Sequence, residues 1–183
     1  AYIDGVLGMN SDFVQRKFHV FGAFPAAMFY IANVSDQASI HKDILKPLMY
    51  TPPGLDVKEV KRGRLLDIIL NDALYHSGVT LERTCDKLVR SLLEGHTVVV
   101  VDGLDDAFSI ATRNVDKRSV DQPATEQVIR GPREGFIEML TTNLALLRYR
   151  LQTPEFRIDI MEIGQRTRSK VAICYIQDIT DKD

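Results

Sequence analysis

The residues best suited to chemistry lie in the run RGPREGF, which covers residues 130–136. Arg130 and Arg133 place two planar guanidinium groups beside the amide-rich start of an expected helix, where together they could hold a carboxylate or a phosphate. Gly131 and Pro132 restrict the backbone just ahead of that helix. A structural alternative stays open, in which both arginines pair with nearby carboxylates and fix the angle at which the chain enters the helix. The candidate acidic partners are Asp121, Glu126 and Glu134.

Two further groups of charged residues are dense enough to consider. Asp102, Asp105 and Asp106 could hold Ca²⁺ or Mg²⁺ through carboxylate oxygens. Their spacing lacks the calcium-loop pattern, and Asp and Gly are the residues that a tight turn between strands prefers, so the sequence favours a turn. Residues 166–170 carry three basic side chains, which favours a solvated hairpin tip or a contact with another subunit.

The motifs of the common enzyme classes are absent from the sequence. It contains no glycine-rich phosphate loop, no G-x-S-x-G and no H-E-x-x-H, and its four histidines are scattered. Cys85 and Cys174 have no Cys or His at ligand spacing, so we expect buried free thiols. A net charge of −2 gives no reason to expect a nucleic-acid partner. We therefore expect no catalytic activity, no cofactor and no metal site.

Length and composition indicate a soluble globular unit. The chain has 183 residues, of which 45% are hydrophobic and 26% charged, close to the globular average. No apolar run approaches the roughly 20 residues that cross a bilayer. The chain begins without Met and ends directly after a strand-like run, so we expect a fragment of a longer protein.

The amino-terminal half is expected to hold a hairpin and several helices. Residues 12–34 read as strand, turn and strand. Helices are indicated over residues 36–49, 65–74 and 81–93. Ser35 and Asp36 could cap the first of these helices. Thr80 and Gly95 stand where the N-cap and C-cap residues of the last of these helices belong.

The carboxyl-terminal half is expected to be a compact α/β unit. Four consecutive valines within 97–101 predict a strand that is buried on both faces. Further strands are indicated over 108–112, 156–160 and 171–176. Apolar residues at helical spacing predict a long helix over 136–151, with Arg148 complementing its dipole. The fold class is therefore α/β (α+β), with one subdomain over 1–94 and a second over 95–183, in which a mixed sheet packs on the long helix.

The region between Arg118 and Leu151 also carries a pattern of residues that belongs to a known family. Besides RGPREGF, its members are Arg118, Ser119, Val120, Gln122, Pro123, Glu126, Glu138, Thr142, Asn143, Leu146, Leu147 and Arg150. On these residues the chain resembles the A subunits of GerA-type spore germinant receptors. The resemblance is specific from about residue 94 to 181 and loose before that.

This resemblance implies the soluble amino-terminal domain of a membrane receptor subunit. Such A subunits join that domain to several membrane helices, and they work with B and C subunits in the spore inner membrane. Nutrients such as amino acids and sugars trigger ion release. The family's domain is similar in fold to two-lobed substrate-binding proteins, and we expect it on the spore-core side. Other A subunits are expected partners, and no catalytic activity is attributed to the family.

The sequence therefore predicts a sensory or transducing domain that helps to trigger germination. In this hypothesis two lobes adjust their relative position, and RGPREGF couples the polar connection before it to the long helix. A nutrient could bind directly between the lobes through Arg130 or Arg133. The alternative is a subunit-interaction module with no ligand of its own, which works through exposed loops and residues 166–170.

Overall fold

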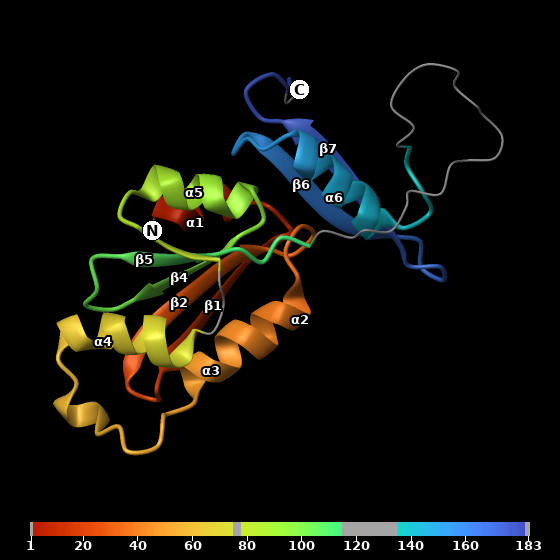
Figure 1. Cartoon of the computed structure of the whole chain (residues 1–183). Coiled ribbons are helices and arrows are strands. Elements are labelled where there is room, and N and C mark those ends of the chain that lie inside the picture. The colour runs from red at the N-terminus through yellow and green to blue at the C-terminus, as the bar shows by residue number, and fades with distance from the viewer. Residues whose placement is uncertain (1, 75–77, 115–134, 182–183) are drawn as a thin grey trace, which may run out of the picture.

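The computed structural model describes residues 2–74, 78–114 and 135–181, which form a large unit and a smaller one (Figure 1). The large unit is built on a five-stranded sheet of order β1-β2-β4-β5-β3, in which all pairs are antiparallel. Its strands are β1 (Phe13–Val20), β2 (Phe24–Ile31), β3 (Val79–Glu82), β4 (Thr97–Val101) and β5 (Ala107–Ile110).

Helices cover both faces of this sheet (Figure 1). On one face lie α1 (Tyr2–Leu7) and α5 (Cys85–Leu93). On the other lie α2 (Gln37–Ser39), α3 (Lys46–Met49) and α4 (Arg62–Ile68), extended by π-helical turns over Ile40–Leu45 and Ile69–Ala73 and preceded by a 3₁₀ turn over Val57–Glu59. The sheet is therefore the middle layer of three.

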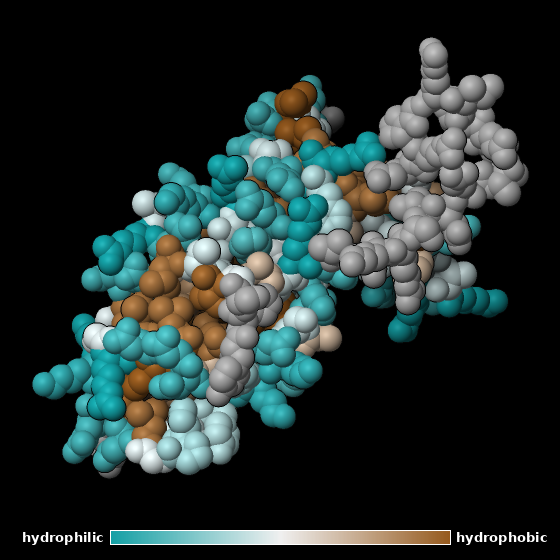
Figure 2. All heavy atoms as spheres, in the orientation of Figure 1, coloured by the Kyte–Doolittle hydropathy of each residue, from teal (hydrophilic) through white to brown (hydrophobic). Residues whose placement is uncertain are grey.

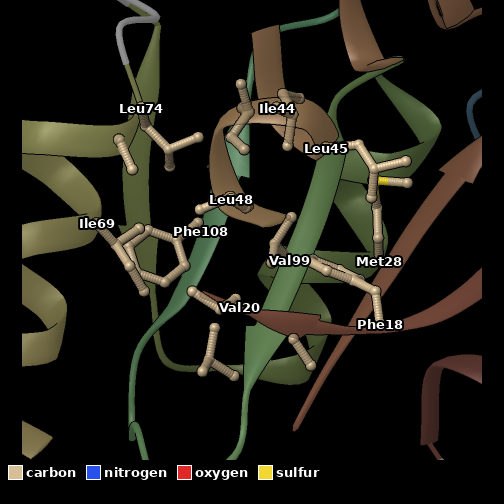
Figure 3. Packing of buried hydrophobic residues seen from close by; sticks show 14 of the residues in the cluster. Phe18, Val20, Met28, Ile44, Leu45, Leu48, Ile69, Leu74, Val99 and Phe108 are labelled. Atoms are coloured by element: carbon tan, nitrogen blue, oxygen red, sulfur yellow. The ribbon is translucent and has the colours of Figure 1, made fainter. Parts of the chain in front are cut away.

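Alternating side chains of the central strands fill both cores. Met28 and Val99 point toward the α3 side, as Figure 3 shows, while Phe29 and Val98 belong to the cluster under α1 and α5. Because each face of β4 meets a helical layer, apolar side chains are favoured on both faces of the strand from Val98 onward. The valine run over 97–101 is explained by this burial, and the prediction of a doubly buried strand is confirmed.

The first long helix is capped as the sequence predicts. The Asp36 carboxylate accepts hydrogen bonds from the backbone N–H groups of Ala38 (3.0 Å) and Ser39 (3.3 Å), which have no partner within the helix. At the end of α5, Gly95 has a φ of +90°, a left-handed conformation that suits a residue without Cβ. Both cap predictions are confirmed.

The smaller unit consists of α6 (Leu140–Arg150) and the antiparallel pair β6 (Phe156–Ile163) and β7 (Ser169–Ile176). Its buried core is a cluster of three residues, Leu144, Phe156 and Ile158. In Figure 1, α6 lies across the face of the β6–β7 ribbon that is turned toward the viewer. The α/β fold class is confirmed, with antiparallel sheets.

Two predicted helix starts are wrong. Thr80 caps no helix, because Val79–Glu82 pairs with β5 as strand β3 and α5 begins only at Cys85. The long helix begins at Leu140 rather than at residue 136. There the Asn143 amide accepts a hydrogen bond from the Ile137 backbone N–H (2.8 Å) and donates one to its C=O (2.6 Å), which takes Ile137 out of helical bonding.

The expected boundary at residues 94 and 95 falls inside the large sheet. Because β4 pairs with β2 across that position, the strands over 97–110 join the amino-terminal elements instead of the β6–β7 ribbon. The strand pairing thus does not follow the division into 1–94 and 95–183. Cys85 is exposed rather than buried, since it stands at the first turn of α5, while Cys174 is half-buried against α6.

Candidate coupling site between the two units

A buried ion pair joins the two units. Arg148 of α6 donates from Nε to Asp12 Oδ2 (3.1 Å) and from Nη2 to Asp12 Oδ1 (2.8 Å), a two-point contact between guanidinium and carboxylate. Both side chains are 1% exposed. Asp12 directly precedes β1, so this contact links the first strand of the large sheet to the helix of the smaller unit.

The remaining hydrogen-bonding groups around Arg148 are also satisfied. Its Nη2 donates to Asn10 Oδ1 (2.9 Å), its Nη1 donates to the Phe156 backbone C=O (3.0 Å), and its guanidinium lies 5.0 Å from the centre of the Phe156 ring. Asn33 donates a further bond to the Asp12 carboxylate (3.2 Å). Full satisfaction is what makes a buried charge pair tolerable in a low-dielectric interior.

The segment that supplies Asn10 also runs along the outer edge of β6. The Ile158 backbone N–H donates to Asn10 Oδ1 (3.2 Å), the Ser11 N–H donates to the Ile158 C=O (3.0 Å), and the Ile160 N–H donates to Ser11 Oγ (3.0 Å). Arg157 adds a bond from Nη1 to the C=O of Val6 in α1 (2.9 Å). We call the contacts among residues 6–12, Arg148 and residues 156–160 the joint.

The contacts of the joint are hydrogen bonds and an ion pair. Because such contacts depend on the angle between donor and acceptor, they constrain the orientation of the two units as well as their distance. Removing one partner of a buried pair leaves the other charge uncompensated, which typically costs about 3–5 kcal/mol. Replacing both partners with apolar groups can be nearly neutral. The pair therefore fixes the relative position of α6 and β1 more firmly than an equal area of apolar contact would.

A groove of about 490 Å³ opens beside the joint. Its walls come from α1 and α5 of the large unit and from Gln152 and Pro154, which lead from α6 into β6. The Tyr2 hydroxyl donates to Asp86 (2.8 Å) on one wall, and this bond raises the pKa of Tyr2. Arg90 and Glu94 form an exposed ion pair on the same helix (3.0 Å). The groove thus offers both charge signs beside apolar walls.

The residues that the sequence singled out first cannot be placed. Arg130, Gly131, Pro132, Arg133, Glu134 and Glu126 lie outside the described residues. The described chain resumes at Gly135, and the Phe136 side chain is 67% exposed. The role of RGPREGF therefore stays a prediction.

The other charged groups have simple surroundings. Residues 102–106 form the predicted turn between β4 and β5, where Asp106 receives a hydrogen bond from Arg83 Nε (2.6 Å). Arg166, Arg168 and Lys170 are exposed at the tip of the β6–β7 hairpin. Within the described ranges, no cluster of His, Cys, Asp and Glu is arranged to hold a metal ion. Nor does any described helix have the length and apolarity to cross a bilayer.

Sequence reasoning missed the joint although a signal was present. Arg148 follows Leu144 by one helical turn, so it shares the apolar face of the helix instead of the solvent face. A charge within an apolar stripe predicts a buried partner, because an unpaired buried charge is too costly. Nothing in the local sequence identifies that partner as Asp12, which lies 136 residues away.

Comparison with known proteins supplies the remaining evidence. The family model described as "Bacillus/Clostridium GerA spore germination protein" matches residues 1–183. The chain is 30% identical over 178 residues to spore germination protein KA of Bacillus subtilis, covering 96% of this chain and 32% of that protein. It is 35% identical over 175 residues to spore germination protein B1 of the same species, covering 94% and 35%. The chain thus spans about a third of these relatives.

A solved structure is also similar across the whole chain. It is the N-terminal domain of the A subunit of the Bacillus megaterium spore germinant receptor GerK3. The two share 26% sequence identity with a TM-score of 0.71, and the match covers 99% of this chain and 64% of that one.

Proposed function

Since the chain belongs to the family of Bacillus/Clostridium GerA spore germination proteins, we propose that it is a transducing domain of a germinant-receptor A subunit, whose joint couples the two units. The membership itself supports a role in germination, because its relatives include spore germination proteins KA and B1. It places the chain with germinant-receptor subunits rather than with a known enzyme family. The observation that carries the coupling role is the buried pair of Arg148 and Asp12.

The route of coupling runs through α1. Tyr2 and Val6 line the groove, and the same short segment continues to Asn10 and Asp12 in the joint. A ligand or partner that displaces α1 would therefore disturb the bond from Arg157 to Val6 and, through Asn10 and Asp12, the geometry around Arg148. Packed interfaces of this kind convert small shifts at one site into discrete rearrangements, because they resist continuous deformation.

The ligand proposed for the groove is a small polar nutrient, such as an amino acid or a sugar. Its volume of about 490 Å³ falls within the range of small-molecule sites. Arg90 can meet an anionic group, while Asp86 and Glu94 can meet an ammonium or hydroxyl groups. Arg130, Arg133 and the rest of RGPREGF remain proposed contributors to ligand binding or coupling, although their placement is not described.

The receptor setting is part of the same proposal. The partners would be the B and C subunits and other A subunits, in the spore inner membrane, with this domain on the spore-core side. In the second candidate function, residues 166–170 hold subunits together without a ligand. The exposure of Arg166, Arg168 and Lys170 at a hairpin tip favours that candidate.

The test of coupling uses the whole receptor in spores. Arg148→Ala should reduce nutrient-triggered germination at least about tenfold if the joint transmits the signal, since removing a buried charge partner costs several kcal/mol. Arg83→Ala is the matched control, because it removes an exposed ion pair with Asp106 far from the joint. Receptor abundance is measured by immunoblot in each strain. Normal germination of Arg148→Ala spores at normal abundance contradicts the proposal.

Ligand binding is tested separately by NMR titration of the chain with amino acids and sugars. Shifts at α1 and α5 at millimolar ligand would support the groove, and their absence would remove the ligand from the proposal. For the second candidate, reversing the charges of Arg166, Arg168 and Lys170 should reduce subunit co-purification while leaving the nutrient response of assembled receptor unchanged.

A further inference from the structure

One edge of the β6–β7 ribbon is covered by residues 10 and 11, whereas no described residue pairs with the other edge. Ile158 and Ile160 turn their backbone groups outward from β6, because they bond with Asn10 and Ser11. In an antiparallel pair, the residues opposite such positions also point their N–H and C=O groups outward. Their partners on β7 are Cys174 and Ala172.

The same alternation extends to Lys170, which pairs with Glu162. Successive outward backbone groups at Lys170, Ala172 and Cys174 therefore form a free strand edge, and no described residue bonds with them. An edge of this kind is a template for another strand. A two-stranded sheet is itself only marginally stable without further strands or cover.

Toward the hairpin tip, the ribbon face that points away from α6 carries exposed apolar side chains, whereas Arg157, nearer the joint on the same face, is buried. Phe156, Ile158, Ala172 and Cys174 face α6, so the alternate positions face the opposite side. On that opposite side, Met161 is 41% exposed, Ile163 52%, Val171 38% and Ile173 49%. Four large apolar side chains in two adjacent strands form one continuous patch, which we call the outer face.

The geometry of α6 explains why it leaves even its own side partly open. Eleven residues of helix extend about 17 Å at 1.5 Å per residue, whereas eight residues of strand extend about 26 Å. About 9 Å of the ribbon, roughly a third of its length, therefore projects beyond the helix. Ile160, on the α6 side, is still 37% exposed. The described residues thus leave the β7 edge, the outer face and the tip of the ribbon without cover.

We propose that further polypeptide of the same domain covers this surface, adding at least one strand to the edge of β7 and burying the outer face. The solved relative has length available for such a segment, because the match covers 99% of this chain but only 64% of that one. An added strand would pair with the free backbone groups of β7, and its segment would bring apolar side chains to cover the outer face. A lipid surface has no partner for the free N–H and C=O groups.

This proposal rests on the family membership but not on the transducing role. The experiment compares the 183-residue chain with a version lengthened by the natural flanking sequence of its gene to the size of the relative's domain. Hydrogen exchange at the amides of Lys170, Ala172 and Cys174 should slow at least about tenfold in the longer chain, because paired edge amides exchange only by opening. Equal exchange in both chains, or a gene without such flanking sequence, overturns the proposal.

A pair of matched substitutions gives a second readout. Ile173→Asp and Met49→Asp alter side chains of nearly equal exposure, 49% and 48%, one on the outer face and one at the end of α3. In the 183-residue chain both should shift Tm by similar small amounts. In the longer chain Ile173→Asp should lower Tm by about 5 °C or more, since the carboxylate becomes buried, while Met49→Asp keeps its small effect.

Two other occupants are distinguished in the same samples. Protection of β7 amides in the 183-residue chain that rises with protein concentration, together with a dimer by ultracentrifugation, assigns the surface to a second copy and overturns the proposal. Protection that appears only with phosphatidylglycerol vesicles assigns it to lipid and overturns it as well. Germination assays bear on neither result, so failure here leaves the proposed function standing.

Discussion

The two units of the molecule differ in how many apolar side chains they bury. The large unit encloses apolar clusters of 18 and 11 buried residues, one on each face of its sheet. The smaller unit encloses only three, and eight of the 13 exposed large apolar side chains in the described chain lie within residues 135–181. The large unit can therefore fold on its own contacts, whereas the smaller one depends on its neighbours.

The smaller unit is held in place largely by polar contacts. Ala145 and Tyr149 of α6 pack against the cluster under α1 and α5, but the buried attachment is the joint, in which Arg148, Asp12 and Asn10 exchange directed hydrogen bonds. Apolar area on the large unit also reaches the surface, between β5 and α4 in Figure 2, but it is the rim of a filled core. The comparison indicates a more stable large unit that carries a less stable smaller one.

The largest expected effect is a cavity in the large unit. Phe108 of β5 is fully buried in the core on the α3 side, near Leu48 and Ile69 (Figure 3), so Phe108→Ala should lower the free energy of unfolding by about 3–5 kcal/mol. Denaturant unfolding followed by circular dichroism measures this loss. Tyr50→Ala is the control, because that side chain is 63% exposed and should change stability by less than about 0.5 kcal/mol. Similar losses for both variants would mean that the core is not the main source of stability.

The second-largest expected effect is the loss of stability when the ion pair of the joint is broken. Asp12→Ala should cost about 3 kcal/mol, because it leaves Arg148 buried without its counter-charge. The loss should appear as faster hydrogen exchange in α6, β6 and β7, with slower-exchanging amides of β2 and β4 little changed. In the double variant Asp12→Leu/Arg148→Met most of the loss should be recovered, since no charge is left unpaired. Uniformly faster exchange across both units would contradict the division of stability proposed here.

The contrast between the units also governs what the sequence could predict. The hairpin of β1 and β2, the capped helix after Asp36 and the valine strand β4 follow from local patterns, and all three are confirmed. Thr80 was misplaced because its strand is defined by pairing with β5, a tertiary contact that overrides a local capping signal. The start of α6 was misplaced because the Asn143 side chain competes for the Ile137 backbone.

The candidate site was less predictable than the fold. RGPREGF was chosen for its dense charge, whereas the joint assembles from Asn10, Asp12, Arg148 and Phe156, which are far apart in the sequence. Only the position of Arg148 within an apolar stripe gave a local signal. One sequence can show that such a charge needs a partner, but the partner is fixed by the path of the chain.

A smaller effect concerns the helix cap of the large unit. Asp36→Ala should cost about 1 kcal/mol, because the backbone N–H groups of Ala38 and Ser39 lose their acceptor. The bonds from Ser39 lower the pKa of Asp36, so the contribution of the carboxylate is present at neutral pH and lost as the pH falls through that lowered pKa. Thermal unfolding at pH 7 and pH 3 measures both. Asp67→Ala, which removes an exposed carboxylate inside α4, provides the control.

The smallest effect is a pH dependence confined to the large unit. His96 leads into β4 with its Nδ1 3.0 Å from Ser109 Oγ, and burial together with the charge of Arg113 lowers its pKa from 6.5, against the opposing charge of Glu94. The unfolded chain then binds a proton more readily than the folded chain, so stability should decrease as the pH falls below about 6.5.

Thermal unfolding of wild type and His96→Gln between pH 7.5 and 5.5 tests this, since glutamine can keep a bond to Ser109 without titrating in that range. The variant should lose part of the decrease, whereas His19→Gln, at an exposed position of β1, should retain it. Hydrogen exchange should place the decrease in β4 and β5, because His96 bonds across that strand pair. A decrease located in α6 and the ribbon would instead make the joint the pH-sensitive element and reverse the comparison between the units.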